Sequence, residues 1–295
     1  MGKILGGVLS AVGALTASSA MPCASVFNAS AMAYLQSERV AIIWEPQSGT
    51  EHFIREAEFR GTGGHFGFLV PTPTKPSLAE AKSAGLARLW RHRPSNVFPE
   101  PKAELGAGFG GGGGRGAIQI VKQEQVSGYD ATVLTGGNGQ LLLEWLAANQ
   151  YQPRHSVAQW SNSYMERDWF MTAFKIAKTT ESEGVQTQPV RITFGASRPF
   201  YPYREPDEPR PRNGVQRRLI LYVVAPFWVQ GRLEKGFQVW NAKSYRVTVP
   251  ESERRALVQE LNLDDKAIPS PIRMTMFIDE TDRRPPSDLY FEALR

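Results

Sequence analysis

The chain has 295 residues, which suffices for one large domain or two ordinary ones, and its 41% hydrophobic and 21% charged residues exclude wholesale disorder. The formal net charge of +5 is small for this length, and basic residues alternate with acidic ones, so we expect no binding to nucleic acid. A single cysteine excludes an intrachain disulfide, so stability must come from packing.

The first twenty residues have the layout of a secretory signal peptide. Lys3 supplies a short positive segment, residues 4–17 are small or apolar, and Ser18, Ser19 and Ala20 fit a cleavage site. The apolar run is shorter than the roughly 20 residues of a spanning helix. We expect cleavage near Ala20 and a periplasmic or extracellular protein without a transmembrane span. The alternative is a buried N-terminal helix of the domain itself.

Cys23 follows the expected cleavage site. Lipidation there is disfavoured because Pro22 occupies a position that requires a small residue. Intermolecular pairing, a reactive thiol and an inert side chain remain open, and the inert reading is favoured because free cysteines are usually buried.

Three strands are expected early in the chain. Residues 39–44 and 52–59 flank turn residues and predict a hairpin, in which Phe53, Arg55, Ala57 and Phe59 share one face. Residues 65–70 predict a third strand that completes an antiparallel meander.

A helix and a long loop are expected next. Ser77 and Glu80 fit a capping box, so the helix is predicted to begin there and to stop before Pro94. Residues 94–116 are rich in proline and glycine and predict an exposed loop.

The remainder alternates between strand and helix patterns. Asn138 is the expected cap of a helix that ends at Asn149, and Pro250 suits the first turn of the last helix. The expected strands are 117–126, 129–134, 169–177, 190–195, 217–225, 236–240, 245–249 and 272–279; the other helices are 156–165 and 250–261; and 197–213 is a second long loop.

These elements predict an α+β fold with predominantly antiparallel strands and about four helices, because strands and helices do not alternate regularly. The chain is interpreted as a signal peptide at 1–20 followed by two packed lobes. The N-terminal lobe spans 21–105, a glycine-rich loop spans 106–116, and the C-terminal lobe spans 117–295. A single sheet-rich domain is the alternative.

No cofactor or metal site is expected. The glycines at 106–111 match a dinucleotide fingerprint formally, but no strand precedes them and no helix follows. The four histidines are scattered without ligand spacing: His52, His65, His92 and His155.

The second long loop is the best candidate for ligand binding. It interleaves arginines with aromatic residues, a combination that can hold a polyanion or a sugar acid, although nearby acidic residues offset part of the charge. The candidate residues are Arg198, Tyr201, Tyr203, Arg204, Arg210 and Arg212.

Two enzymatic alternatives are open. Cys23 with a histidine could form a nucleophile and base, and Glu56 with Glu58 would share one strand face as a carboxylate pair. Neither has a local catalytic signature.

Several segments stand out in order along the chain: MPCA at 21–24, TEHFIR at 50–55, FGFLVPTP at 66–73, YDATVL at 129–134 ahead of Trp145 and Leu146, PVRITF at 189–194 and RPFYPY at 198–203. Together they resemble the bacterial DUF2330 family over most of the mature chain, from about Cys23 to Ala225. The resemblance implies an exported bacterial protein and supplies no activity. Many relatives carry more than one cysteine near the mature N-terminus, so the single Cys23 argues against a shared disulfide or cysteine metal site here.

The leading hypothesis is therefore a non-catalytic exported protein that binds an anionic ligand or an envelope protein through its two long loops. The alternative is an exported hydrolase of one of the two kinds above.

Overall fold

The structure is a computed structural model. It describes residues 25–27, 32–62, 64–97, 118–151, 153–179, 185–207, 217–281 and 284–294. The expected signal peptide, Cys23, the glycine-rich segment 106–116, Arg210 and Arg212 lie outside the described residues.

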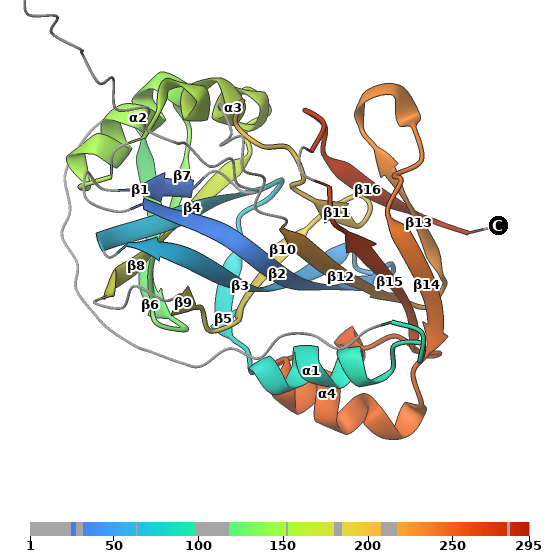
Figure 1. Ribbon diagram of the computed structural model, residues 1–295. Helices are drawn as coiled ribbons and strands as arrows, with labels where there is room; N and C mark the ends of the chain where they lie inside the picture. The colour runs from blue at the N-terminus through green and yellow to red at the C-terminus, as the bar shows by residue number, and fades with distance from the viewer. Residues whose placement is uncertain are drawn as a thin grey trace, which may run out of the picture.

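An eight-stranded sheet runs through the middle of the protein (Figure 1). All its pairings are antiparallel except the parallel pair β2–β12. β12 is apolar on both faces because both faces are covered. In spatial order the strands are β14 (Lys243–Thr248), β15 (Arg273–Asp279), β12 (Arg218–Ala225), β2 (Met32–Glu45), β3 (Thr50–Thr62), β10 (Val190–Gly195) and β5 (Ser77–Glu80), and β9 (Val185–Gln186) pairs with β3 beside them.

Two smaller sheets complete the strand pairing. The five-stranded sheet has the order β1 (Ser25–Phe27), β4 (Gly64–Thr72), β8 (Phe170–Thr179), β7 (Tyr129–Thr135) and β6 (Gln119–Val126). The three-stranded sheet has the order β11 (Phe200–Tyr201), β16 (Leu289–Ala293) and β13 (Val229–Leu233).

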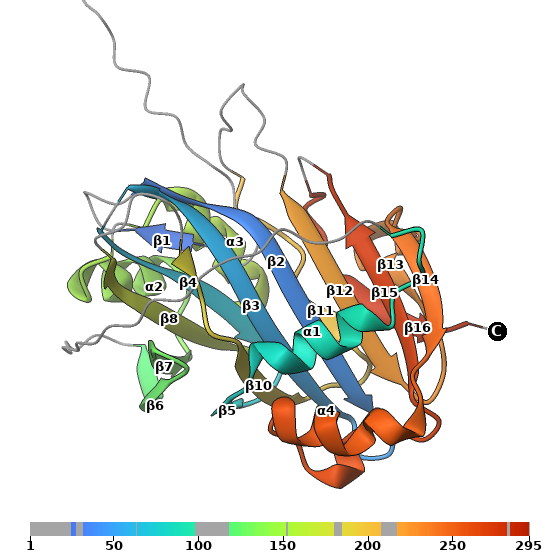
Figure 2. The ribbon, with the colours of Figure 1, turned by 60° about the horizontal axis from the view of Figure 1, so that its bottom comes forward.

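Helices lie outside the sheets. α1 (Ser83–Arg91) and α4 (Arg254–Glu260) cover one face of the eight-stranded sheet, and α2 (Gly139–Ala148) and α3 (His155–Met165) lie beside the five-stranded sheet (Figures 1 and 2). Short 3-10 turns occur at Lys235–Phe237, Glu251–Glu253 and Asp265–Ala267. None of the described helices is long and apolar enough to cross a membrane.

The core has two parts, one on each face of the eight-stranded sheet. Under α1 and α4, Leu86 and Leu257 pack with Ile54 and Met274. On the opposite face, the second part joins the central strands to both smaller sheets and to α2 and α3. Each fully buried aliphatic side chain contributes about 1.5–3 kcal/mol, so the two parts together account for much of the stability.

The α+β class, the antiparallel character and the four helices are confirmed, but three local expectations are wrong. The 65–70 strand does not extend a meander, because β10 occupies the free edge of β3 and β4 pairs with β1 and β8 instead. Ser77–Glu80 forms an edge strand against β10, and α1 begins at Ser83. Gly236, at φ 80°, turns the chain where a strand was expected at 236–240.

Both larger sheets combine strands from the two sides of the glycine-rich segment. β3 pairs with β10 in one sheet, and β4 pairs with β8 in the other. The segments 21–105 and 117–295, proposed as lobes, therefore share both of these sheets.

Candidate functional site

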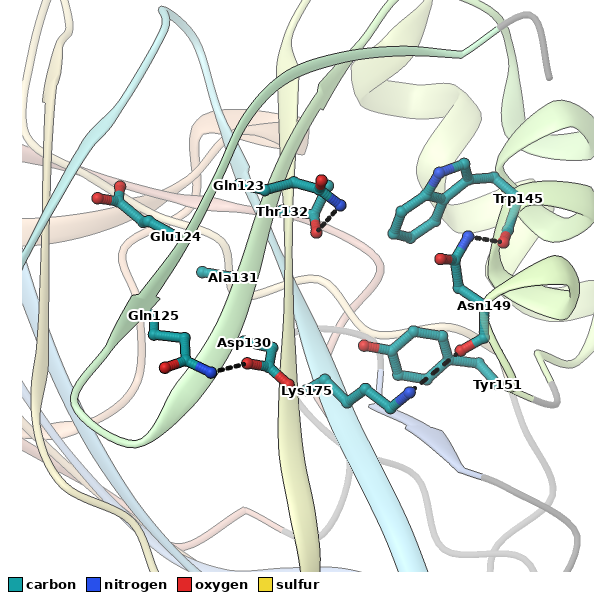
Figure 3. Close-up of a pocket in the computed structure, with 10 residues that line it drawn as sticks. All are labelled: Gln123, Glu124, Gln125, Asp130, Ala131, Thr132, Trp145, Asn149, Tyr151 and Lys175. Carbon is teal, nitrogen blue, oxygen red and sulfur yellow. Dashed lines mark hydrogen bonds between the residues drawn. The ribbon is translucent and has the colours of Figure 1, made fainter. Parts of the chain in front are cut away.

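A pocket of about 290 Å³ lies between α2 and the strands β6, β7 and β8 (Figure 3). The side of the pocket formed by α2 is buried, whereas the side formed by β6 is exposed, so a ligand would enter past β6. The lining residues are Gln123, Glu124, Gln125, Asp130, Ala131, Thr132, Trp145, Asn149, Tyr151 and Lys175.

The inner wall comes from the last turns of α2. Asn138 caps this helix by accepting a hydrogen bond from the Leu141 N–H at 3.0 Å, and Trp145 lies on its buried face. Asn149 ends the helix and donates its side-chain amide to the Trp145 carbonyl at 2.8 Å. The sequence pattern of the helix thus places Trp145 and Asn149, four residues apart, on the pocket.

Tyr151 follows α2 and reaches the pocket wall because the chain turns back there and packs closely against β4. Gln150 has φ 68°, and the Tyr151 N–H then returns to the Leu146 carbonyl at 3.0 Å. A Cβ added at Gly67 of β4 would lie 3.0 Å from Tyr151 Cε1, so the glycine makes room for the ring.

One buried polar group at this wall has no hydrogen-bond partner among the described residues. Trp145 is 5% exposed and its Nε1–H donates no hydrogen bond there. The neighbouring Tyr151 is 6% exposed. Burial raises the pKa of Tyr151, and the Asp130 charge adds to this, so the hydroxyl stays protonated. Figure 3 shows the Tyr151 hydroxyl directed toward the strands.

Lys175 of β8 supplies the cation of the pocket. Its ammonium donates a long hydrogen bond to the Asn149 carbonyl at 3.4 Å and lies 5.5 Å from the Tyr151 ring centroid. Asp130 faces Lys175 in the β7–β8 register, but Asp130 Oδ1 accepts from Gln125 Nε2 at 3.0 Å. Lys175 forms no ion pair with any carboxylate that the structure describes.

The rim toward β6 is polar. Gln123 Nε2 donates to Thr132 Oγ1 at 3.4 Å, and Glu124 pairs with Lys122 at 2.7 Å. The pocket therefore offers aromatic edges, one cation and several amide and hydroxyl groups, which is a set of groups suited to holding a polar ligand.

The candidate loop residues occupy other places. Tyr201 and Tyr203 are buried with ring centroids 6.1 Å apart, and their hydroxyls donate to Glu38 and Asp279. Arg198 is separate from them, with its guanidinium carbon 3.8 Å from the Tyr290 ring centroid.

Arg204, the remaining described candidate, joins a different set of contacts. Its backbone N–H donates to Asp288 at 3.0 Å, and its guanidinium reaches Glu234 at 3.4 Å. Of the loop candidates that the structure describes, only Tyr201 and Tyr203 are thus in direct contact with each other.

The residues behind the enzymatic alternatives have separate partners. Glu56 accepts from Arg39 and Ser83, whereas Glu58 accepts from Ser37 at 3.0 Å. Among the described residues no group of three or more His, Cys, Asp or Glu side chains could hold a metal ion.

His52 lies in a hydrogen-bonded chain across three strands. Its Nε2 is 2.7 Å from Glu45 Oε1 and its Nδ1 is 2.9 Å from Thr193 Oγ1. Burial lowers the pKa of His52, although Glu45 opposes this, so the ring is neutral near pH 7. Because the Glu45 carboxylate can only accept, Nε2–H donates to it and Nδ1 accepts a hydrogen bond from the Thr193 hydroxyl. The side chain of His65 lies outside the described part of the structure.

Comparison with known proteins agrees with the resemblance found in the sequence. A search of curated proteins gave no match. The family model of uncharacterized proteins conserved in bacteria, DUF2330, matches residues 16–249. Because this match covers most of the chain, the protein belongs to the DUF2330 family.

Proposed function

We propose that this protein is an exported, non-catalytic binding protein that takes up a small polar ligand in the pocket between α2 and β6–β8. The observation that carries the proposal is the Lys175 ammonium, which lies beside the Tyr151 ring in the pocket, donates only a long hydrogen bond to the Asn149 carbonyl and forms no ion pair among the described residues. A bound anion would give this ammonium a charge-assisted hydrogen bond, which is stronger than the bond to a neutral carbonyl.

Binding is tested with Trp145 as the reporter. The protein contains seven tryptophans, so fluorotryptophan labelling with Trp145→Phe assigns the resonance of this side chain. We expect members of a polar small-molecule panel to shift it in ¹⁹F NMR and Tyr151→Phe to weaken their binding, with Tyr245→Phe on β14 as the matched control. A panel that leaves the Trp145 resonance in place would overturn the proposal.

The export part rests on the charged, apolar and small-residue succession in residues 1–20. Expression of the full chain in a bacterium and N-terminal sequencing of the product tests it. We expect a periplasmic or secreted chain that begins at Met21; an uncleaved chain in the cytoplasm would contradict export.

A further inference from the structure

We infer that the ligand of this pocket is an acidic saccharide, bound with its carboxylate on Lys175 and its hydroxyl groups toward β6 and β7. This inference rests on the proposed function and names the ligand class. It is argued from where charge, ring surface and hydrogen-bonding groups lie within the pocket.

The anionic part follows from Lys175. A lysine whose stem is partly buried against Tyr151 and whose ammonium has only a long bond to a carbonyl is a ready partner for an anion. In Figure 3 the Lys175 side chain runs away from Asp130 toward α2, and Asp130 is engaged by Gln125. A ligand carboxylate at the α2 end of the pocket would therefore contact the Lys175 ammonium on the side away from Asp130.

The hydroxylated part follows from the opposite end of the pocket. There the lining consists of amide and hydroxyl groups, which donate and accept, and a carboxylate, which accepts: Gln123, Gln125, Asp130 and Thr132. These groups pair with one another through one bond each, so an apolar acid that displaced water would leave their remaining donors and acceptors unsatisfied, which weighs against such a ligand. Sugar hydroxyls donate and accept at once, so they satisfy both kinds of group.

The volume of the pocket and its aromatic wall fit a single sugar ring. A volume of about 290 Å³ corresponds to roughly ten water molecules at about 30 Å³ each, which is small for a ligand pocket. The edges of Trp145 and Tyr151 face the C–H groups of a ring held this way. Because the β6 side is open, the ring can be a free sugar acid or the terminal residue of a polysaccharide.

The test compares matched ligands by ¹⁹F NMR titration and calorimetry on the full mature chain. Glucuronate and galacturonate are set against glucose and galactose, and cyclohexanecarboxylate serves as the acid without hydroxyls. We expect the sugar acids to bind about ten- to a hundredfold tighter than the neutral sugars, the range for a hydrogen bond to a charged group, and tighter than cyclohexanecarboxylate.

Variants assign the preference to one side chain. Lys175→Gln should remove the preference for sugar acids, Lys175→Arg should keep most of it, and Lys243→Gln, which changes an exposed lysine of β14 outside the pocket lining, should leave it unchanged. Oligouronates that bind more tightly than the monosaccharides would identify a polysaccharide end as the source, and equal binding would identify the free sugar acid.

Two results separate the ligand class from the binding function. If neutral ligands shift the Trp145 resonance as well as acidic ones do, or Lys175→Gln binds sugar acids as tightly as the unchanged protein, the acidic saccharide is wrong while the pocket remains a binding site. If no compound of any class shifts the resonance, both proposals fail.

Discussion

Arg55 of β3 places its guanidinium carbon 4.3 Å from the centre of the Phe68 ring in β4, so a buried cation links the eight-stranded sheet to the five-stranded one. Its Nε also lies 3.5 Å from Glu38 Oε1, and both side chains are at most 1% exposed. Burial alone would raise the pKa of Glu38, but Arg55 and Arg284 outweigh it and hold the pKa below its usual range.

Arg55→Met should therefore destabilise the protein by about 3–5 kcal/mol, because it leaves the Glu38 charge buried with less compensation. Urea unfolding measures the change. The double variant Glu38→Gln/Arg55→Met should recover part of the loss, and Arg218→Met, which breaks an exposed pair with Glu280, should cost at most about 1 kcal/mol. A loss no larger than that of Arg218→Met would contradict the expected importance of Arg55.

The buried carboxyl group of Asp288 should make the free energy of unfolding decrease as the pH rises from 4 to 6. Burial raises its pKa from 3.8 to about 6, even though Tyr164 and the Arg204 N–H donate to it. The folded protein binds this proton more tightly than the unfolded chain, so the contribution is complete below pH 3.8 and is lost as the pH rises through about 6. The loss is about 3 kcal/mol at about 1.4 kcal/mol per pH unit.

Asp288→Asn carries no proton and should lack this slope. The difference in unfolding free energy between the two proteins, measured by urea titration from pH 3.5 to 7, should change by that amount. Parallel pH profiles would mean that the folded protein and the unfolded chain bind this proton equally tightly, which would contradict a raised pKa of Asp288.

Glu51 should act in the same direction from another part of the core. It is fully buried, and burial raises its pKa well above the usual value although the Phe200 N–H donates to it at 2.7 Å. Its stability contribution is present below pH 4.5 and is lost at higher pH. Glu51→Gln keeps an acceptor for Phe200 without the charge, so its melting temperature relative to the unchanged protein should rise as the pH increases above 4.5. A constant difference would mean that the folded protein and the unfolded chain bind the Glu51 proton equally tightly, which would contradict the raised pKa.

Gly139 should tolerate no side chain. A Cβ at this first residue of α2 would lie 2.1 Å from the Ala158 carbonyl oxygen of α3, and a backbone atom cannot move aside as a side chain can. Gly139→Ala should cost about 1–3 kcal/mol, whereas Gln140→Ala at the adjacent exposed position should stay within about 0.5 kcal/mol. Thermal unfolding of the two variants provides the comparison, and equal midpoints would mean that α2 and α3 can separate.

Local patterns predicted the elements whose causes are local. The Asn138 cap and the apolar face of α2 are visible in the sequence, and the β2–β3 hairpin follows from two strands separated by turn residues. Strand pairing was harder to predict, because the alternation of apolar and polar residues shows which residues share a face of a strand. It does not show which edge of a strand already has a partner. β10 takes the edge of β3 and also converts Ser77–Glu80 from an apparent capping box into a strand.

The pocket could not be assembled from the sequence, because its residues come from four elements between Gln123 and Lys175. Tyr151 and Lys175 carry no motif, and Trp145 was visible only as a core residue of its helix. The buried ion pair left a clearer signal. Arg55 shares a strand face with Phe53 and Ala57, and a charged residue on an apolar face predicts a buried partner.

The parallel pair of β2 and β12 also constrains when the fold can form. Val40 and Leu221 are partners in this pair although about 180 residues separate them, and β2 lies in the middle of the largest sheet. During synthesis, the edge of β2 in the β2–β3 hairpin therefore stays unpaired until β12 has been made, when about three quarters of the chain is complete. The eight-stranded sheet is thus completed late in synthesis, whereas all strands of the five-stranded sheet, whose last strand in chain order ends at Thr179, are available earlier.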